Sequence, residues 1–256
     1  MLIRHRIGLS ILCLGIAGSV APLALSAGAP PAVIAAAVAD PGRPEADRAR
    51  DADRKPAEVT ALAGIKAGSK VAEMWPGGGY FTRIFSKAVG DKGVVYAWVP
   101  PAPPNAPPGR DPGAAIRTLA AEPGYSNVKV VNLDPAVALP EQVDVVWTSL
   151  NYHDMHNRPA DYIASINKAA LNALKPGGVY VVIDHAAEKG SGARDTQKFH
   201  RIDEDLVKTE VLAAGFEAAG DSAVLRHADD KHDKSSHEVE RGKTDQFVLL
   251  FRKPRK

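Results

Sequence analysis

The stretch of sequence that decides the fold is Val71-Ala72-Glu73-Met74-Trp75-Pro76-Gly77-Gly78-Gly79-Tyr80-Phe81. Residues 70–75 form an apolar run typical of a strand, and residues 80–89 place Phe81 and Phe85 on one face of a helix. Glycines between a strand and a helix let a ligand approach the backbone, and the helix N-terminus presents free N–H groups to it. The segment therefore predicts a ligand-binding turn, although any strand-to-helix turn can require glycine.

Apolar runs alternate with amphipathic helical patterns through the rest of the chain. The predicted strands cover residues 70–75, 94–99, 128–133, 143–150, 179–184, 216–226 and 246–251. The predicted helices between them cover residues 56–63, 80–89, 114–121, 160–174 and 206–214. Strands without a polar side are typical of a parallel sheet covered on both faces. We expect a doubly wound α/β fold with a mostly parallel seven-stranded sheet, helices on both faces and an antiparallel last strand.

The first 29 residues have the pattern of a signal peptide. Arg4 and Arg6 precede an uncharged apolar run at residues 7–25, and Ala27-Gly28-Ala29 offers a small-residue cleavage site. Small residues and the Pro30-Pro31 pair disfavour a lasting membrane span. We therefore expect export, to the bacterial periplasm, without stable membrane insertion.

The remaining chain divides into a lead-in and one domain. Residues 30–56 predict a lead-in outside the core, with a short exposed helix at 45–55, and residues 57–256 predict the domain itself. Two interruptions, the proline-rich residues 100–112 and the polar residues 229–243, are expected to be surface loops.

Composition narrows the classes of function. The chain has 256 residues, of which 24% are charged, and its one cysteine excludes an internal disulfide framework. Loss of residues 1–29 removes two of the 32 basic residues and none of the 30 acidic ones, so that the charges balance. This neutral chain lacks the basic footprint of a nucleic-acid-binding protein, and we expect a small molecule as its partner. The sequence does not indicate an oligomeric state.

The residues around the glycines bear on the kind of ligand. Glu73, at the end of the first strand, would repel a pyrophosphate but attract a cationic amino group or a sulfonium. Thr82 stands where a dinucleotide site prefers a small residue, and residues 98–99 supply no acid for a ribose. The pattern favours S-adenosylmethionine (SAM) over NAD as the cofactor.

The chain resembles the class I SAM-dependent methyltransferases, and more narrowly a group of exported bacterial predicted methyltransferases. The resemblance covers residues 47–251. It rests on the segments Ala46-Asp47-Arg48-Ala49-Arg50-Asp51, Arg54-Lys55-Pro56, Pro76-Gly77-Gly78-Gly79-Tyr80-Phe81-Thr82, Leu174-Lys175-Pro176-Gly177-Gly178 and Ala213-Ala214-Gly215-Phe216. It implies a Rossmann-like methyltransferase fold and, as the expected function, an exported SAM-dependent methyltransferase that acts on a small molecule.

The resemblance also implies a set of cofactor-binding residues. These are Glu73, Pro76, Gly77, Gly78, Gly79, Trp98, Asp134 and Asn151. Glu73 matches the acid near the methionine amino group, and Asp134 matches the position that usually binds the adenine amino group. Trp75 replaces the usual first glycine, and Trp98 stands near the usual ribose-binding acid. Asp134 is equally explained as a turn former before Pro135.

A second group of polar residues follows the fourth strand, at residues 149–157. The carboxyl ends of parallel strands line the ligand crevice of such a sheet. We expect His153 to act as a base or positioning group, since imidazole titrates near neutral pH. Asp154 would orient it or accept the proton itself, and Tyr152 would line the acceptor pocket.

Other interpretations of the histidines and charges stay open. His153, His156 and His185 could serve a metal-assisted enzyme, but no linear metal motif supports them and we expect no metal site. A second cluster is predicted to be solvated, with weak metal affinity as the alternative; its members are His227, His232, His237, Asp229, Asp230 and Asp233.

Two further alternatives concern the lead-in and the function itself. Arg48, Asp51 and Arg54 are spaced as on one helix face, which predicts a surface ion-pair stripe or a lid over the cofactor. The competing function is a binding protein without catalysis, whose Trp75 and Trp98 reshape the pocket for another ligand.

Overall fold

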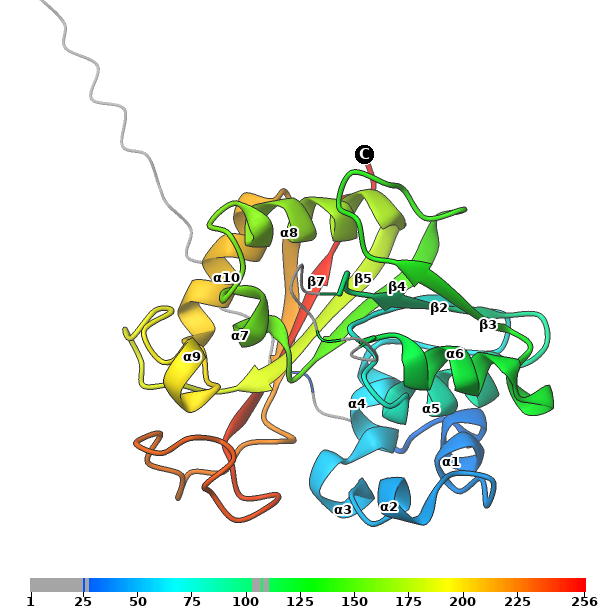
Figure 1. The fold of residues 1–256 in the computed structure, drawn as a ribbon, viewed down its shortest axis with the longest axis horizontal. Helices are drawn as coiled ribbons and strands as arrows, with labels where there is room; N and C mark the ends of the chain where they lie inside the picture. Colours follow the sequence, from blue (N-terminus) through cyan, green and yellow to red (C-terminus); the bar gives the residue numbers. More distant parts are fainter. Residues whose placement is uncertain (1–24, 26–27, 103–106, 108–110) are drawn as a thin grey trace, which may run out of the picture.

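A seven-stranded sheet forms the centre of the molecule (Figure 1). The computed structural model describes Leu25 and residues 28–102, 107 and 111–256. The strands are β1 (Lys70–Met74), β2 (Val94–Val99), β3 (Val128–Asn132), β4 (Val143–Ser149), β5 (Leu174–His185), β6 (Glu217–Ser222) and β7 (Gln246–Arg252). Their order is β3-β2-β1-β4-β5-β7-β6. Strands β1 to β5 pair in parallel, and β7 runs antiparallel to β5 and β6. The predicted fold class is confirmed.

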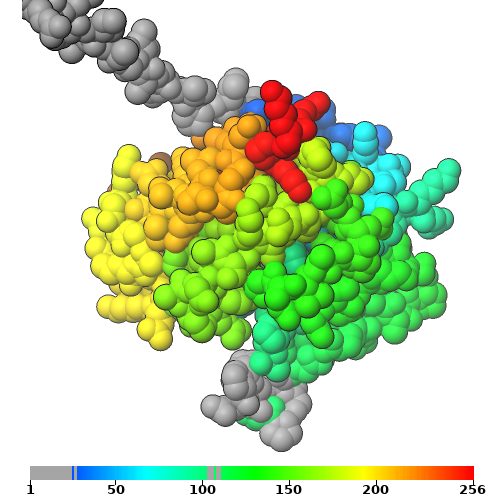
Figure 2. Space-filling view, turned by 90° about the horizontal axis from the view of Figure 1, so that it is seen from above, coloured from blue at the N-terminus to red at the C-terminus, as the bar shows by residue number. Residues whose placement is uncertain are grey.

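Helices cover both faces of the sheet, and each face has its own apolar cluster. One face packs against α1 (Ala32–Val38), α4 (Pro56–Leu62), α5 (Tyr80–Val89) and α6 (Ala114–Ala121). The other packs against α8 (Tyr162–Ala173) and α10 (Glu204–Ala213). Seen from above, α8 and α10 form an outer layer beside the C-terminal residues (Figure 2). The inner strands β1, β2, β4 and β7 are mostly apolar because both of their sides are buried, whereas the edge strands β3 and β6 carry exposed polar side chains.

Short helices occupy several connections between the longer elements. They are α2 (Glu45–Arg48), α3 (Asp51–Arg54), η1 (Pro123–Tyr125), α7 (Tyr152–Met155) and α9 (Thr196–Phe199). The single helix predicted at 45–55 is thus two, because a turn at residues 49–50 separates α2 from α3. Lys55, in a left-handed conformation with φ of 40°, ends α3. Strand β5 begins at Leu174 rather than near 179, and a register shift against β4 accommodates the extra residues.

The prediction that the lead-in lies outside the core is wrong. Ile34 and Ala37 on α1 are buried in the first apolar cluster, and α1 packs on α5. Burial of these side chains stabilises the domain because it removes apolar area from water, at about 25 cal/mol per Å². Residues 30–56 are therefore an integral layer of the fold.

The predicted signal segment, residues 1–29, lies outside the described residues except for Leu25, Gly28 and Ala29. Leu25 donates a backbone hydrogen bond to the carbonyl of Asp221, at 2.8 Å. Among the helices of the described chain, none is long and apolar enough to cross a membrane.

The chain reverses its direction of winding between β1 and β4. From β1 the connections lead outward to β2 and β3, whereas β4 and the strands after it lie on the other side of β1. In such sheets the ligand crevice lies outside the carboxyl ends of the strands at this point. A ligand site is therefore expected between the end of β1 and the end of β4.

Candidate functional site

A cavity of about 340 Å³ lies at the carboxyl ends of β1 and β4. Its walls combine the turn after β1, the end of β4 and the N-terminal helix α3 with its preceding residue. The residues that line it include two arginines, one acid, two glycines and one amide: Arg50, Arg54, Glu73, Gly77, Gly78 and Asn151. The volume lies in the lower part of the range for small-molecule sites, roughly 300–1,000 Å³.

The three glycines have different surroundings. A side chain added at Gly77 or Gly78 would meet no atom within 4 Å, so that both present bare backbone to open space. A Cβ at Gly79 would lie 2.8 Å from Leu119 on α6, and Gly79 has a φ of 85°. Gly77 and Gly78 thus form an open cradle, whereas Gly79 permits close helix packing and does not line the cavity.

Two residues without the freedom of glycine adopt left-handed conformations beside the cavity. Trp75 has a φ of 52° after β1, and Leu150 has a φ of 59° after β4. The Asn151 amide nitrogen donates to the carbonyl oxygen of Trp75, at 3.2 Å, and so ties the two strand ends together. Non-glycine residues in this region cost roughly 1–3 kcal/mol each and concentrate at functional sites. Trp75 and Leu150 form walls of the cavity, which remains open beside them.

Asn151, predicted to bind the cofactor, lines the cavity and also holds its neighbours in place. Its amide nitrogen also reaches the carbonyl oxygen of Ser149, at 3.2 Å, and its amide oxygen accepts from the Thr148 hydroxyl. Its polar atoms are therefore engaged within the protein. It lines the cavity but serves to fix the shape of the site.

Glu73 is buried at the end of β1 and faces the cavity. Its carboxylate accepts a hydrogen bond from the hydroxyl of Thr82, on the first turn of α5. Burial raises the pKa of Glu73 to about 8, and the Thr82 hydroxyl and the Arg54 charge oppose this rise. Glu73 is thus largely protonated near neutral pH, and a cationic ligand in the cavity would lower its pKa and favour its charged form.

Arg54 is the cation that faces Glu73 across the site. Its guanidinium donates to the Ser149 hydroxyl at 3.1 Å and lies over the Tyr80 ring, 4.3 Å from the centroid. Burial lowers the pKa of Arg54 to about 10, and it stays charged near neutral pH. Near neutral pH the free cavity therefore presents one cation, Arg54, and one acid, Glu73, that a cationic ligand would ionise.

The predicted ion-pair stripe is wrong, because its members separate. Asp51 pairs with the buried Arg43 at 2.7 Å and accepts from the Tyr80 hydroxyl at 2.6 Å. Arg48 is exposed, and Arg54 turns into the cavity. The helix break at residues 49–50 rotates the faces of α2 and α3 apart, which the sequence spacing did not reveal.

A second cavity of about 500 Å³ adjoins the first, and both are lined by Pro100. Asp134 lines it after β3, where its carboxylate accepts from the Ala136 backbone N–H at 2.9 Å. Trp98 lines neither cavity: it is buried in the second apolar cluster and donates to the carbonyl of Asn132, at 3.2 Å. The structure thus places Asp134 beside the site and removes Trp98 from it.

The predicted catalytic residues do not meet in the first cavity. His153 is buried, with its Nδ1 2.7 Å from the Asp184 carboxylate, which also accepts from the His153 backbone N–H. Burial opposes a charge on His153, but Asp184 and Asp154 outweigh it and raise its pKa. The expectation that His153 and Asp154 face a ligand in that cavity is not met, since neither lines it.

Tyr152 and His156 point elsewhere. Tyr152 is buried under α8 and α10, where its hydroxyl accepts from Asn167 at 2.8 Å. The prediction that it lines an acceptor pocket is wrong. His156 contacts Glu210 at 3.0 Å, so that the predicted grouping of His153, His156 and His185 does not form. A helix turn at α7 sends consecutive residues in different directions.

Of His153, His156 and His185, only His185, at the end of β5, lines one of these cavities. It lines a third cavity, of about 170 Å³, which shares Arg50, Arg54 and Leu150 with the first. Burial lowers the pKa of His185 to about 4, so that the ring is neutral near pH 7. Its Nδ1 is buried and has no hydrogen-bond partner among the described residues. Sequence periodicity places His185 at a strand end but does not show which cavity it enters.

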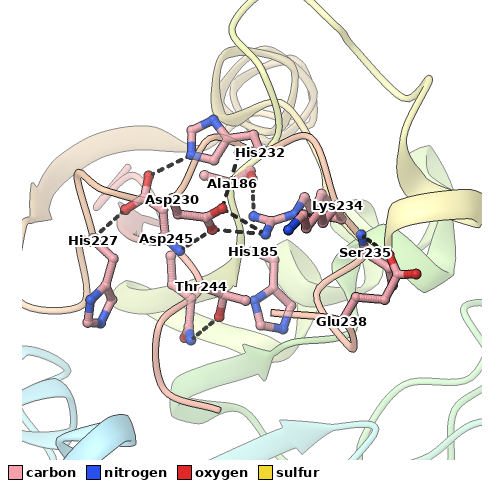
Figure 3. Close-up of polar contacts among 12 residues, drawn as sticks. His185, Ala186, His227, Asp230, His232, Lys234, Ser235, Glu238, Thr244 and Asp245 are labelled. Atoms are coloured by element: carbon pink, nitrogen blue, oxygen red, sulfur yellow. Dashed lines mark hydrogen bonds and ion pairs between the residues drawn. The ribbon is translucent and has the colours of Figure 1, made fainter. Parts of the chain in front are cut away.

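A buried ion pair fixes the polar segment that covers this side of the site (Figure 3). Arg201 donates to the backbone carbonyls of Ala186 and Lys234 and pairs with Asp230 at 2.8 Å. Asp230 in turn accepts from the backbone N–H of Asp245 at 2.7 Å. The predicted solvated cluster is wrong for Asp230, whose carboxylate is buried and holds the segment against β5.

Comparisons with solved structures agree with this fold. A SAM-dependent methyltransferase from Aquifex aeolicus is 19% identical, with a TM-score of 0.56 over 82% of this chain and 95% of that one. The chain has a Rossmann-like methyltransferase fold. An arsenic(III) SAM methyltransferase from Chlamydomonas reinhardtii is 18% identical, with a TM-score of 0.53 over 88% of this chain and 74% of that one.

The same fold also carries another activity. The cyclase SpnF is 16% identical and has a TM-score of 0.56 over 86% of this chain and 91% of that one. Neither a protein-family model nor a curated protein matches the sequence. Function must therefore be inferred from the site itself.

Proposed function

We propose that the protein is a methyltransferase that binds SAM across the first and second cavities and methylates a small molecule. The observation that carries the proposal is the buried Glu73 carboxylate, which faces a cavity beside the bare backbone of Gly77 and Gly78. A carboxylate there suits a ligand with a cationic amino group, and the open glycines leave room for it.

The residues present fit SAM at both ends. Glu73 would hold the amino group of its methionine part, and Arg54 would hold the carboxylate, which makes the cavity complementary to a zwitterion. The second cavity would take the nucleoside, with Asp134 at its rim. When bound, SAM would supply an electrophilic methyl group for transfer to a nucleophile of the acceptor, with S-adenosylhomocysteine as the leaving group.

The third cavity offers a place for the methyl acceptor. It is small, shares a wall with the first cavity and contains the neutral His185 ring. A neutral imidazole can accept a hydrogen bond from a hydroxyl or amine and so orient the attacking atom. Positioning of this kind supplies much of the rate in a displacement reaction.

Export to the periplasm is part of the proposal and rests on the pattern of residues 1–29. Cell fractionation, together with N-terminal sequencing of the mature chain, tests it. A mature N-terminus near residue 30 in the periplasmic fraction supports export. Full-length chain in the cytosol contradicts it.

Calorimetric titration with SAM and S-adenosylhomocysteine, followed by a turnover assay with small acceptors, tests the function. Micromolar binding of both ligands and the formation of S-adenosylhomocysteine support a methyltransferase. Binding without turnover in any acceptor class supports a binding protein instead. No heat with either ligand contradicts the proposal.

A further inference from the structure

Three side chains from segments far apart in the sequence come together near His185, whose ring centroid lies 6.3 Å from that of His153. His153 and Asp154 lie on α7, and His200 follows α9. One donor atom of each residue lies within 4.8 Å of the other two. We infer that His153, Asp154 and His200 form a binding site for a divalent transition metal ion of the zinc type.

The separations fit ligands around a common centre. The Asp154 Oδ1 atom lies 3.5 Å from His153 Nε2 and 3.6 Å from His200 Nδ1. Both separations are too long for hydrogen bonds. They are close to the ~3.3 Å that separates neighbouring donors of a tetrahedral zinc ion with bonds of about 2.0–2.1 Å. The three atoms thus face one another without bonding directly.

Asp184 prepares His153 for this role. It contacts Nδ1 at 2.7 Å and also accepts from the His153 backbone N–H at 2.8 Å. A proton held on Nδ1 leaves the lone pair of Nε2 free, and that atom points toward Asp154. Metal-binding histidines commonly donate their other ring nitrogen to a carboxylate in this way, which fixes the tautomer and the ring orientation.

The third ligand is also held in place. His200 has a φ of 52°, a left-handed conformation that ends α9 and brings its ring within 5.5 Å of the His153 ring, between centroids. The ring of His237 lies edge-on to His200 at 4.5 Å. His237 belongs to the polar segment 229–243, which the ion pair of Arg201 and Asp230 holds in place. The backbone therefore maintains the cluster without help from an ion.

The donor set indicates which ions suit the site. Two imidazole nitrogens and one carboxylate oxygen suit zinc or iron(II) better than magnesium or calcium, which prefer oxygen alone. Three protein ligands leave at least one position open for water or a substrate atom. His153 and Asp154 thus gain a role that their absence from the first cavity left unexplained. The linear sequence did not reveal it because His200 lies more than forty positions away.

Zinc titration of the chelator-treated full chain, without SAM, tests the site. We expect one Zn²⁺ per chain and a higher thermal unfolding midpoint on binding. His200→Ala and Asp154→Asn, both at partly exposed positions, should each weaken binding by at least about tenfold and remove the thermal shift. The matched control is His227→Ala, a histidine outside the cluster, which should behave as wild type.

Zinc-edge X-ray absorption of the wild-type chain makes the test independent of any variant's folding. Two imidazole ligands and light donors at about 2.0–2.1 Å support the site. Binding that is not stoichiometric, or equal affinity in wild type and both variants, overturns the inference. Because no step uses SAM, these results do not depend on whether the proposed methyltransferase activity is correct.

Discussion

Thr82 donates a hydrogen bond from the first turn of α5 to the buried carboxylate of Glu73 at the end of β1. The bond joins the two elements that flank the glycine turn. Burial still outweighs it, so that Glu73 keeps a raised pKa of about 8. An acid in this state is stabilised in its charged form by any cation that enters the cavity, which links ligand binding, protonation and stability.

The stability of the free protein should depend on pH through Glu73. Its pKa rises from 4.5 to about 8 on folding, so the folded state retains a proton that the unfolded state has lost. The stabilising effect of the proton is present below pH 4.5 and is lost as the pH rises toward 8, by up to about 1.4 kcal/mol per pH unit. Urea unfolding of wild type and Glu73→Gln between pH 5 and 9 measures it. The free energy of unfolding of the wild type should fall relative to that of Glu73→Gln as the pH rises. A difference between the two proteins that does not change with pH would contradict the raised pKa of Glu73.

Two glycine substitutions should have opposite signatures. Gly79→Ala meets Leu119 at 2.8 Å at a φ of 85°, and we expect it to destabilise the fold by about 1–3 kcal/mol. Gly78→Ala meets nothing in the free protein, so it should leave stability nearly unchanged and weaken SAM binding by about tenfold. Unfolding curves and calorimetry on the pair separate the two effects. Equal losses of stability in both variants would contradict the assignment of Gly78 to the ligand cradle and Gly79 to helix packing.

Much of the fold could be predicted because burial on both sides gives the inner strands β1, β2, β4 and β5 mostly apolar runs, and because glycine and proline mark many of their ends. The burial of the lead-in was not predicted. Ile34 and Ala37 lie in a stretch of mostly small alanine side chains, which does not distinguish a helix that packs on the core from one that is exposed. Short helices such as α7 were missed, since four residues are too few for a periodic pattern.

The site was predictable where local sequence shapes it and not where distant segments meet. Glu73, Gly77 and Gly78 lie on one strand–turn–helix unit, so their position follows from the local pattern. Arg54 reaches the cavity through the packing of the N-terminal layer. His185 lines a cavity that His153 does not, although the strands β4 and β5 that lead to them are neighbours. These placements depend on helix breaks and side-chain direction, which spacing alone does not encode.

Arg54 should recognise the carboxylate of the ligand's amino-acid part. Arg54→Met removes the charge while keeping an apolar stem over the Tyr80 ring. We expect affinity for SAM and S-adenosylhomocysteine to fall by about tenfold, which corresponds to about 1.4 kcal/mol. Methylthioadenosine, which lacks the amino-acid part, is the control ligand and should bind wild type and variant alike. An equal loss for all three ligands would mean that the variant distorts the whole cavity.

His185 should act on the acceptor and not on the cofactor. Replacing it by glutamine removes the neutral ring from the third cavity but leaves the first cavity's lining intact. We expect kcat to fall by about ten- to a hundredfold, with SAM affinity within about twofold of wild type. His227→Gln is the matched control. Turnover at saturating SAM measures the effect. An unchanged kcat would contradict the proposed role of His185 at the methyl acceptor.

The most direct measurement is SAM calorimetry at pH 7 in two buffers of different ionisation enthalpy, on wild type and Glu73→Gln. Because Glu73 is protonated below about pH 8 in the free protein, a cationic ligand should displace its proton on binding. We expect wild type to release close to one proton and the variant to bind at least about tenfold more weakly with no such release. Tight SAM binding by the variant, with the same proton release as wild type, would show that Glu73 does not receive the ligand.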